Sequence, residues 1–265
     1  MLRVASVNVN GIRAASRRGM DGWLATRDVD VLALQEVRAP TEVLADHLEP
    51  LGWHVAHDLA DAAGRAGVAV ATRARPLAHR TGVGSDEFDG AGRWVETDVA
   101  TSDGTPLTVV SAYVHTGQAG DPRQDVKLRF LDAALDRLAK LHADGHHAVL
   151  TGDLNVAHSH LDIKNWKGNR GKSGFLPEEQ ARLDRLSTEL GWVDVARAAA
   201  GDVAGPYTWW SWRGKAFDND SGWRIDYQWA SPALAAAARD CVVDRAPTYA
   251  ERWSDHAPVV VDYEV

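Results

Sequence analysis

Side chains that could hold a divalent cation lie at the ends of short apolar runs at four separate places in the sequence. They are asparagines, acids and one histidine, namely Asn8, Asn10, Glu36, Asp153, Asn155, Asp255 and His256. Mg²⁺ binds carboxylate and amide oxygens and keeps several waters, so an isolated glutamate with neighbouring Asp and Asn side chains would suit it. Each acid alone is more often a cap or a surface charge. The repetition of one arrangement is what indicates a cation site.

His256 stands between an acid and Ala257-Pro258 at the start of an apolar run. There its ring could donate to a phosphate oxygen, with a carboxylate fixing the tautomer. Taken alone, the Asp-His-Ala-Pro sequence is a weak motif. A zinc site built on cysteines is impossible, because Cys241 is the one cysteine of the chain.

The segment 154–176 lacks clean periodicity and carries an excess of positive charge. Its basic residues are Lys164, Lys167, Arg170 and Lys172, against the single acid Asp162. Loops of this length are commonly functional, and a basic loop on an acidic protein favours an anionic ligand. On charge alone, a merely solvated loop is an equal alternative.

Tryptophan is concentrated towards the C-terminal part of the chain, where five of the 11 lie between Tyr207 and Trp229. Arg213, Lys215 and Arg224 are interleaved with them. Buried aromatic packing is the plainer explanation, and composition slightly favours it. Aromatic faces beside cations also suit stacking on a nucleic acid. Both interpretations stay open at this point.

Strand-like and helical patterns run along the whole chain. Nine short runs bounded by turn residues predict strands at 2–9, 29–34, 67–72, 94–100, 107–113, 147–152, 225–230, 241–245 and 258–263. Apolar residues at three- and four-residue steps predict a helix at 125–142, and further helices are expected at 17–26, 41–51 and 177–190. Many strands and fewer helices predict a layered α/β sandwich, with helices on the outer faces of sheets and chemistry in the loops at strand ends.

The 265 residues carry a net charge of −8, which excludes a broadly basic nucleic-acid coat protein. No linker, charge run or short repeat divides the chain, so a single domain over 1–265 is expected. No apolar stretch is long enough to cross a bilayer. The N-terminus has no leader pattern, and the lone cysteine cannot form an internal disulfide. We expect a monomer in the reducing cytoplasm, without a membrane partner.

Seven motifs, in their order, closely resemble the exonuclease III family of apurinic/apyrimidinic (AP) endonucleases. They are SVNVNGIR (6–13), LQE (34–36), SAYV (111–114), GDLNVAH (152–158), NWKGN (165–169) with GF (174–175), GWRID (222–226) and SDHAP (254–258). Those at 6–13, 34–36, 152–158 and 254–258 are shared with the wider endonuclease/exonuclease/phosphatase superfamily and imply metal-dependent phosphoester cleavage. The basic loop and the tryptophan segment resemble the DNA-repair branch. The resemblance runs from residue 2 to about 262, and it implies a four-layered α/β sandwich of two mixed sheets packed face to face.

The resemblance also implies roles at the matching positions. Glu36 is similar to the principal Mg²⁺ or Mn²⁺ ligand, and Asn10, Asn8 and Asp255 fall beside the metal. Asp153 resembles the residue that aligns or deprotonates the attacking water.

On the phosphate side, the resemblance assigns contacts to three residues. Asn155 assists Asp153, His256 resembles the phosphate-contacting histidine, and Tyr113 resembles a phosphate-side phenol. Asp226 matches the carboxylate that orients the histidine.

Further positions match the DNA-binding parts of the family. Trp209, Trp223 and Ile225 fall where relatives line the pocket for an extruded abasic sugar. Contacts to the duplex are expected from Lys164, Lys167, Asn169, Arg170, Lys172, Trp212, Arg213 and Lys215. The implied partner is double-stranded DNA with abasic sites or blocked 3′ ends.

These implications predict a Mg²⁺-dependent DNA-repair nuclease that incises 5′ to an abasic site and that also trims 3′ ends as an exonuclease or phosphatase. A superfamily phosphatase or phosphodiesterase acting on inositol phosphates, phospholipid or RNA is the first alternative, and a non-catalytic DNA-binding module is the second. Two turns depart from the family pattern. His115-Thr116 replaces Pro followed by Asn or Gln, and Arg65-Ala66-Gly67 replaces an aromatic or Ser-containing turn.

Overall fold

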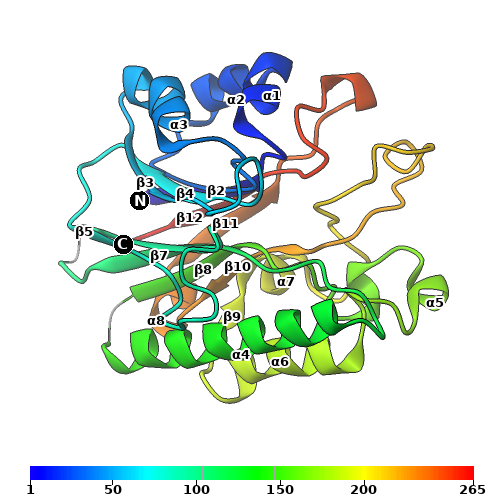
Figure 1. Cartoon of the computed structure of the whole chain (residues 1–265). Coiled ribbons are helices and arrows are strands. Elements are labelled where there is room, and N and C mark those ends of the chain that lie inside the picture. Colours follow the sequence, from blue (N-terminus) through cyan, green and yellow to red (C-terminus); the bar gives the residue numbers. More distant parts are fainter. Residues whose placement is uncertain (103, 146) are drawn as a thin grey trace.

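Two six-stranded sheets packed face to face form the centre of the molecule (Figure 1). The computed structural model describes residues 1–102, 104–145 and 147–265. Across the first sheet the strands are, in spatial order, β11 (Ala238–Val243), β12 (Val259–Tyr263), β1 (Leu2–Asn8), β2 (Val31–Gln35), β4 (Val68–Thr72) and β3 (His54–Asp58). Across the second they are β5 (Ala78–Thr81), β6 (Trp94–Val99), β7 (Leu107–Tyr113), β8 (His147–Asp153), β10 (Asp226–Ala230) and β9 (Val193–Asp194).

Each sheet has one parallel pair of strands at its middle. β1 and β2 are parallel in the first sheet, and β7 and β8 are parallel in the second. The neighbouring pairs β1–β12 and β8–β10 are antiparallel. Both sheets are therefore mixed, as the resemblance implied. The carboxyl ends of four central strands point to one edge, and the first residues of β10 and β12 lie at that edge too.

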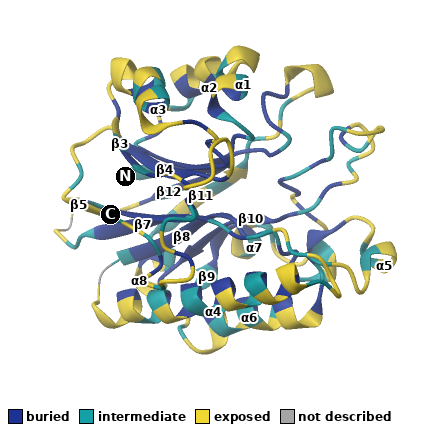
Figure 2. Cartoon of the chain, in the orientation of Figure 1, coloured by how far each residue is buried: buried dark blue, intermediate teal, exposed yellow. Residues whose placement is uncertain are grey.

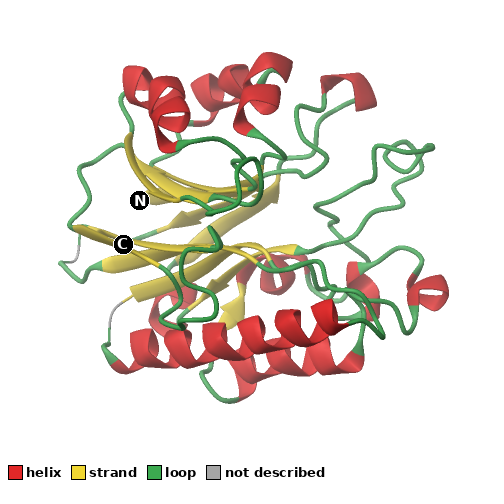
Figure 3. Cartoon of the chain, in the orientation of Figure 1, coloured by secondary structure: helices red, strands yellow, loops and turns green. Residues whose placement is uncertain are grey.

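Helices cover the outer faces of both sheets (Figure 3). Above the first sheet lie α1 (Ile12–Arg18), α2 (Met20–Arg27) and α3 (Thr41–Leu48), and below the second lie α4 (Pro122–Ala143) and α6 (Pro177–Thr188). The shorter helices are α5 (Trp166–Asn169), α7 (Val195–Ala200) and α8 (Pro232–Ala236), with single 3-10 turns at Glu49–Leu51, His160–Asp162 and Tyr249–Glu251. None of the helices in the described ranges combines the length and apolar character needed to cross a membrane.

The apolar core is divided by the sheets into layers. Between the sheets, small Val and Ala side chains from both pack together, including Val4, Val70 and Val149. On the outer faces, one apolar cluster lies between the first sheet and α1 to α3, and another lies between the second sheet and α4 and α6. Figure 2 shows the central strands buried and the helices with exposed outer sides. This arrangement confirms the predicted four-layered α/β sandwich.

The long helix α4 begins and packs as its sequence predicts. The Asp121 side chain accepts from the backbone N–H of Arg123, and Pro122 occupies the first turn, where no N–H donor is needed. Its buried residues recur at three- and four-residue steps and include Phe130, Leu138 and Leu141. Burial of this face anchors the helix against β8, whose last residue is Asp153.

Some elements differ from the sequence prediction. The helix expected at 17–26 is interrupted at Gly19, whose left-handed conformation ends α1 and precedes α2. Most of α1 lies before residue 17 and was not predicted. The strands β3, β5 and β9 and the short helices α5, α7 and α8 were not predicted. β5 is largely exposed and β9 has two residues, so neither produces a clear apolar pattern.

Candidate active site

The strand ends bring seven polar residues to one edge of the sandwich. Asn8 ends β1, Glu36 follows β2, and Asp153 ends β8. Asp226 begins the antiparallel strand β10 directly opposite Asp153. His256 precedes β12, which runs antiparallel to β1, so it returns to the same edge. Asn10 and Asp255 extend the group outward.

A buried amide ties the two central carboxylates together. Asn8 Nδ2 donates to Glu36 Oε1 at 2.7 Å and to Asp153 Oδ2 at 3.0 Å, joining one residue of each sheet to the other. Asn8 Oδ1 accepts from the backbone N–H of Asn10. The second Glu36 oxygen pairs with Arg38. Asn8 therefore presents its donor to the carboxylates, and its predicted role as a metal ligand stays a prediction.

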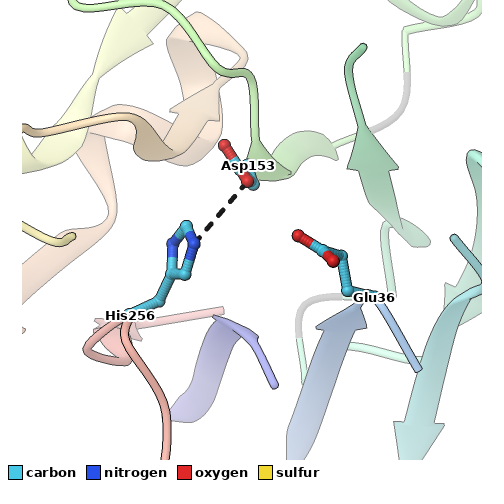
Figure 4. A group of neighbouring side chains, drawn as sticks. All are labelled: Glu36, Asp153 and His256. Atoms are coloured by element: carbon cyan, nitrogen blue, oxygen red, sulfur yellow. Dashed lines mark ion pairs between the residues drawn. The ribbon is translucent and has the colours of Figure 1, made fainter. Parts of the chain in front are cut away.

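His256 is oriented by a buried acid. Its Nδ1 lies 2.9 Å from Asp226 Oδ2, and Thr208 Oγ1 donates to the same oxygen at 2.6 Å. Although burial lowers it, the charge and hydrogen bond of Asp226 raise the pKa of His256 to about 10. The ring is therefore cationic at neutral pH. Its Nε2 is turned towards Asp153 Oδ2, 3.9 Å away (Figure 4).

Asp153 is held in a state suited to accepting a proton near neutral pH. Burial raises the pKa of Asp153 to about 7; the cation of His256 opposes this shift, and the carboxylates of Asp226 and Glu36 add to it. The backbone N–H of Asn155 donates to Asp153 Oδ1 at 2.9 Å. A base whose pKa lies close to the operating pH is effective in proton transfer.

Tyr113 enters the site from the end of β7. Burial, followed by the negative charge of Glu36 and Asp153, raises the pKa of its phenol well above the ordinary value. The hydroxyl therefore stays protonated and can donate. The guanidinium of Arg93 lies over the Tyr113 ring, 4.8 Å from its centroid, and Arg93 Nη1 donates to the Tyr113 carbonyl at 3.0 Å.

Backbone strain is concentrated at this edge. Seven non-glycine residues in the described ranges have positive φ, and four of them line the cleft: Asn10, Glu36, Arg38 and Asn155, at 47° to 51°. A left-handed conformation costs an L-residue about 1–2 kcal/mol, and such residues cluster at functional sites where surrounding contacts hold them. Here Asn8 holds Asn10 and Glu36, Arg38 pairs with Glu36, and Asp153 holds the backbone N–H of Asn155.

These residues line a cleft of about 290 Å³. One wall is apolar and consists of Trp209, Trp223 and Ile225. The two indoles meet edge to face with centroids 6.3 Å apart. Asp255 fixes the Trp209 indole, because its carboxylate accepts from Trp209 Nε1 at 3.2 Å and from Asn10 Nδ2 at 2.9 Å. The rest of the lining is polar and places the carboxylates of Glu36, Asp153 and Asp255 in one cleft with the cations of Arg38 and His256.

The donor set fits a hard divalent cation. Ligand oxygens of Glu36 and Asp153 lie within 4.8 Å of each other and of a ring nitrogen of His256 (Figure 4). The two carboxylates are the ligands on offer, because the protonated His256 ring has no free lone pair. Two carboxylates on one cleft, without thiols, match the oxygen chemistry of Mg²⁺ and Mn²⁺. The site could therefore hold a divalent metal ion.

The predicted DNA-contacting residues fall on two projecting loops. Lys164, Lys167, Asn169, Arg170 and Lys172 lie on the loop that contains α5, and Arg213 and Lys215 lie on the loop before β10. In Figure 1, α5 and the gold-coloured loop project from the same side of the molecule. Arg170 stacks on Trp166 at 4.5 Å.

Trp212 does not line the cleft. The guanidinium of Arg252 lies 4.3 Å and that of Arg18 lies 5.1 Å from its ring centroid, and Tyr249 meets it edge to face. The indole is thus surrounded by cations of its own chain. Its predicted contact with DNA stays a prediction.

Three residues of the site were not recognised in the sequence. Arg38 pairs with Glu36, Arg93 supports Tyr113, and Thr208 bonds Asp226. Arg38 could have been found as a cation two residues after a predicted ligand. The others come from distant segments, and nothing in their local sequence indicates the contact.

A buried carboxylate pair, an acid-oriented histidine and a cleft that could hold a cation have the chemistry that phosphoester hydrolysis needs. The model of the Endonuclease/Exonuclease/phosphatase family matches residues 5–256. This chain belongs to that family.

The relatives narrow the assignment to the exonuclease III group of AP endonucleases. The exodeoxyribonuclease of Bacillus subtilis (strain 168) is 34% identical over 260 residues, covering 97% of this chain and 98% of that protein. The DNA repair nuclease APEX1 of Danio rerio is 33% identical over 270 residues, covering 98% and 81%. The structure of an AP endonuclease from Archaeoglobus fulgidus matches with a TM-score of 0.90 at 29% identity, and both chains are covered completely. The predicted family, fold and hydrolytic nuclease of DNA-repair type are confirmed.

Proposed function

We propose that this nuclease hydrolyses the DNA phosphodiester 5′ to an abasic site with a bound Mg²⁺ or Mn²⁺, leaving a 3′-hydroxyl. The observation that carries the proposal is the convergence of Glu36, Asp153 and His256 on one cleft. The same cleft has a wall of Trp209 and Trp223 beside it. AP endonuclease and exodeoxyribonuclease are the names of relatives that match along nearly the whole chain.

In the proposed mechanism, Asp153 holds a water in line with the leaving 3′ oxygen and takes its proton as the new P–O bond forms. The P–O3′ bond breaks, and the leaving oxygen takes a proton from solvent. A carboxyl with a pKa of about 7 is suited to this step. Attack places negative charge on the phosphate oxygens, where the His256 cation, the Tyr113 hydroxyl and the Asn155 amide donate hydrogen bonds. Asp226 keeps the proton on His256 Nδ1 and leaves Nε2–H for the phosphate. A divalent cation held by Glu36 would neutralise charge on the phosphate.

The apolar wall supplies selectivity for damage. An abasic nucleotide has no base to unstack, so extruding it costs less than extruding a normal one. In the proposal, the part of the cleft that Trp209, Trp223 and Ile225 line accepts a bare sugar and rejects an intact nucleotide by size. Recognition then depends on shape, without reading of bases.

The two projecting loops are the proposed contacts to the duplex on either side of the cleft. Lys164, Lys167 and Lys172 are exposed on one, and Arg213 and Lys215 are exposed on the other. We include 3′-end exonuclease and phosphatase activity in the proposal, because hydrolysis at a 3′ terminus needs the same water, phosphate and cation groups. The monomer, the single domain and the cytoplasmic location stay predictions.

The test is incision of a duplex containing one tetrahydrofuran abasic analogue, with added Mg²⁺. We expect Glu36→Gln and Asp153→Asn to lower kcat by about 10²- to 10⁴-fold. Glu42→Gln, an exposed acid on α3, is the matched control and should leave kcat unchanged. If both site variants cleave as fast as the wild type, the assigned roles are wrong. Turnover of a soluble phosphoinositide without DNA cleavage would favour the phosphatase alternative.

A further inference from the structure

A lysine and a glutamate are completely buried behind the cleft and have no part in the mechanism above. Lys127 of α4 and Glu179 of α6 each have 0% exposed side chains, and Lys127 Nζ lies 2.6 Å from Glu179 Oε1. The other two contacts of Nζ are backbone carbonyls, that of Asn155 at 2.8 Å and that of Thr116 at 3.3 Å. The ammonium thus joins a helix to the loops that follow β7 and β8.

Glu179 joins the same region to the end of the basic loop. Its carboxylate accepts from the backbone N–H groups of Gly174 at 2.7 Å and Leu176 at 3.0 Å, and from Ser173 Oγ at 3.1 Å. Gln124 of α4 donates to it at 2.8 Å. The carboxylate has five donors in all with Lys127, and no water is needed to satisfy it.

Four of the residues that this ion pair holds line the cleft. They are Thr116, Asn155, Ser173 and Gly174, and they come from three separate segments of chain. Packing between the segments is tight: a Cβ at Gly117 would lie 2.5 Å from Gln124 Oε1 and 2.6 Å from Ser173 Oγ. A shift of the ion pair would therefore move several cleft-lining groups together.

We infer that the Lys127–Glu179 pair is a positioning device that sets Asn155 and the polar rim of the cleft for the reaction. The inference rests on the proposed function, in which Asn155 faces the phosphate. Asn155 has a φ of 51°, a conformation that its own backbone disfavours. Lys127 holds its carbonyl, while its N–H is held by Asp153.

Stability alone does not account for the pair. Burying two charges is costly, and well-packed apolar residues in their place are often equally stable or more so. An ion pair with five donors and three acceptors in defined directions fixes backbone positions, which an apolar contact does not. Lys127 and Glu179 do not line the cleft themselves and contact residues that do, so they are positioning residues.

A double-mutant cycle tests this role. We expect Lys127→Met to lower kcat for abasic-site incision by about 10- to 100-fold, the range measured when supporting contacts of active-site groups are removed. Asn155→Ala lowers kcat by itself. In the Asn155→Ala background, Lys127→Met should lower kcat less than threefold further, because the group that it positions is already gone.

Arg137→Met is the matched control. Arg137 lies ten residues further along the same helix and pairs with the buried Glu96 at 2.6 Å, away from the cleft. The Arg137→Met substitution should lower the melting temperature and leave kcat within twofold of the wild type. If Lys127→Met does not fold, Glu179→Gln replaces it, since it removes the charge and keeps the size; the same coupling to Asn155→Ala is expected.

The outcomes separate the inference from the proposed function. Losses from Lys127→Met and Asn155→Ala that multiply, or a folded Lys127→Met variant with wild-type kcat, would overturn the positioning role. A kcat loss in Arg137→Met equal to that in Lys127→Met would overturn it as well, because it would reduce the effect to general stability. Wild-type protein that fails to incise abasic DNA contradicts the proposed function instead.

Discussion

At the scale of single residues, the site depends on charges that are buried but paired. Asp226, Asp153 and His256 are almost completely buried, and an isolated charge there would be very costly. Each has a defined partner: the cation of His256 faces Asp226 Oδ2 and Asp153 Oδ2, and Thr208 and Asn8 donate to those same two oxygens. The result is a cationic histidine and an acid that titrates near neutrality in one cleft.

His115 is a half-buried histidine with the opposite behaviour. It packs against Phe88 and Phe130, and its Nδ1 has no hydrogen-bond partner among the described residues. Burial, followed by the positive charges of Arg93 and Lys127, lowers the pKa of His115 to about 4.

A pH prediction follows from that lowered pKa. Between pH 6.5 and about 4, His115 binds a proton in the unfolded chain but not in the folded protein. Because the unfolded state binds more protons, the free energy of unfolding falls as the pH falls through this range. The contribution to the slope is at most about 1.4 kcal/mol per pH unit. His115→Gln should lose less stability than the wild type between pH 7 and pH 5 in urea titrations. Equal losses in the two proteins would contradict the prediction.

At the scale of elements, strand direction explains why the site exists. β1–β2 and β7–β8 are parallel pairs, and their last residues meet at one edge of each sheet. Because the sheets pack face to face, the two edges oppose each other, and the cleft forms between them. The antiparallel partners β10 and β12 add their first residues there. Ligands commonly bind at the carboxyl ends of parallel strands for this reason.

Gly152 allows β8 to approach β7 one residue before Asp153. Its φ is +130°, and a Cβ there would lie 2.0 Å from the carbonyl oxygen of Ala112. We expect Gly152→Ala to lower the free energy of unfolding by about 3 kcal/mol or more, measured by chemical denaturation. Gly120→Ala is the control, since it has a φ of +75° and open space around it; about 1 kcal/mol is expected. Similar losses at both glycines would contradict the steric explanation.

At the scale of the whole molecule, charge is unevenly distributed. The chain carries −8 overall, yet the exposed loop around α5 is basic. Local positive charge next to the cleft suits a short duplex contact, while the net negative charge opposes binding elsewhere. Affinity for DNA should therefore come from few phosphate contacts.

The salt dependence of DNA binding measures those contacts. Lys164→Ala and Lys167→Ala should each weaken binding of any duplex and reduce the slope of log K against log salt by about 0.9. Lys140→Ala is the control: Lys140 is exposed near the end of α4 that leads into the start of β8, at the opposite edge from the cleft. Fluorescence anisotropy at several salt concentrations gives the slopes. Unchanged slopes for both loop variants would show that this loop does not contact phosphate.

The fold and most of the chemistry could be predicted from local sequence. Periodicity identified α4 and the central strands, and the residues at their ends gave the metal and phosphate candidates, because an element and the residue that follows it are covalently adjacent. The resemblance to exonuclease III enzymes then ordered these candidates into one site. The exposed strand β5 and the two-residue strand β9 were missed, since they bury too little to leave an apolar pattern.

Only the tertiary structure decided which distant residues touch. Four sets of contacts join segments far apart in the chain: Arg93 over the Tyr113 ring, Thr208 with Asp226, Arg18 and Arg252 with Trp212, and Lys127 with Glu179. Such contacts depend on strand order, sheet packing and burial, and none of these is expressed in a local pattern. Residue types and spacing therefore specify the chemistry that is available, whereas packing specifies the partners, the protonation states and the positions in which that chemistry is held.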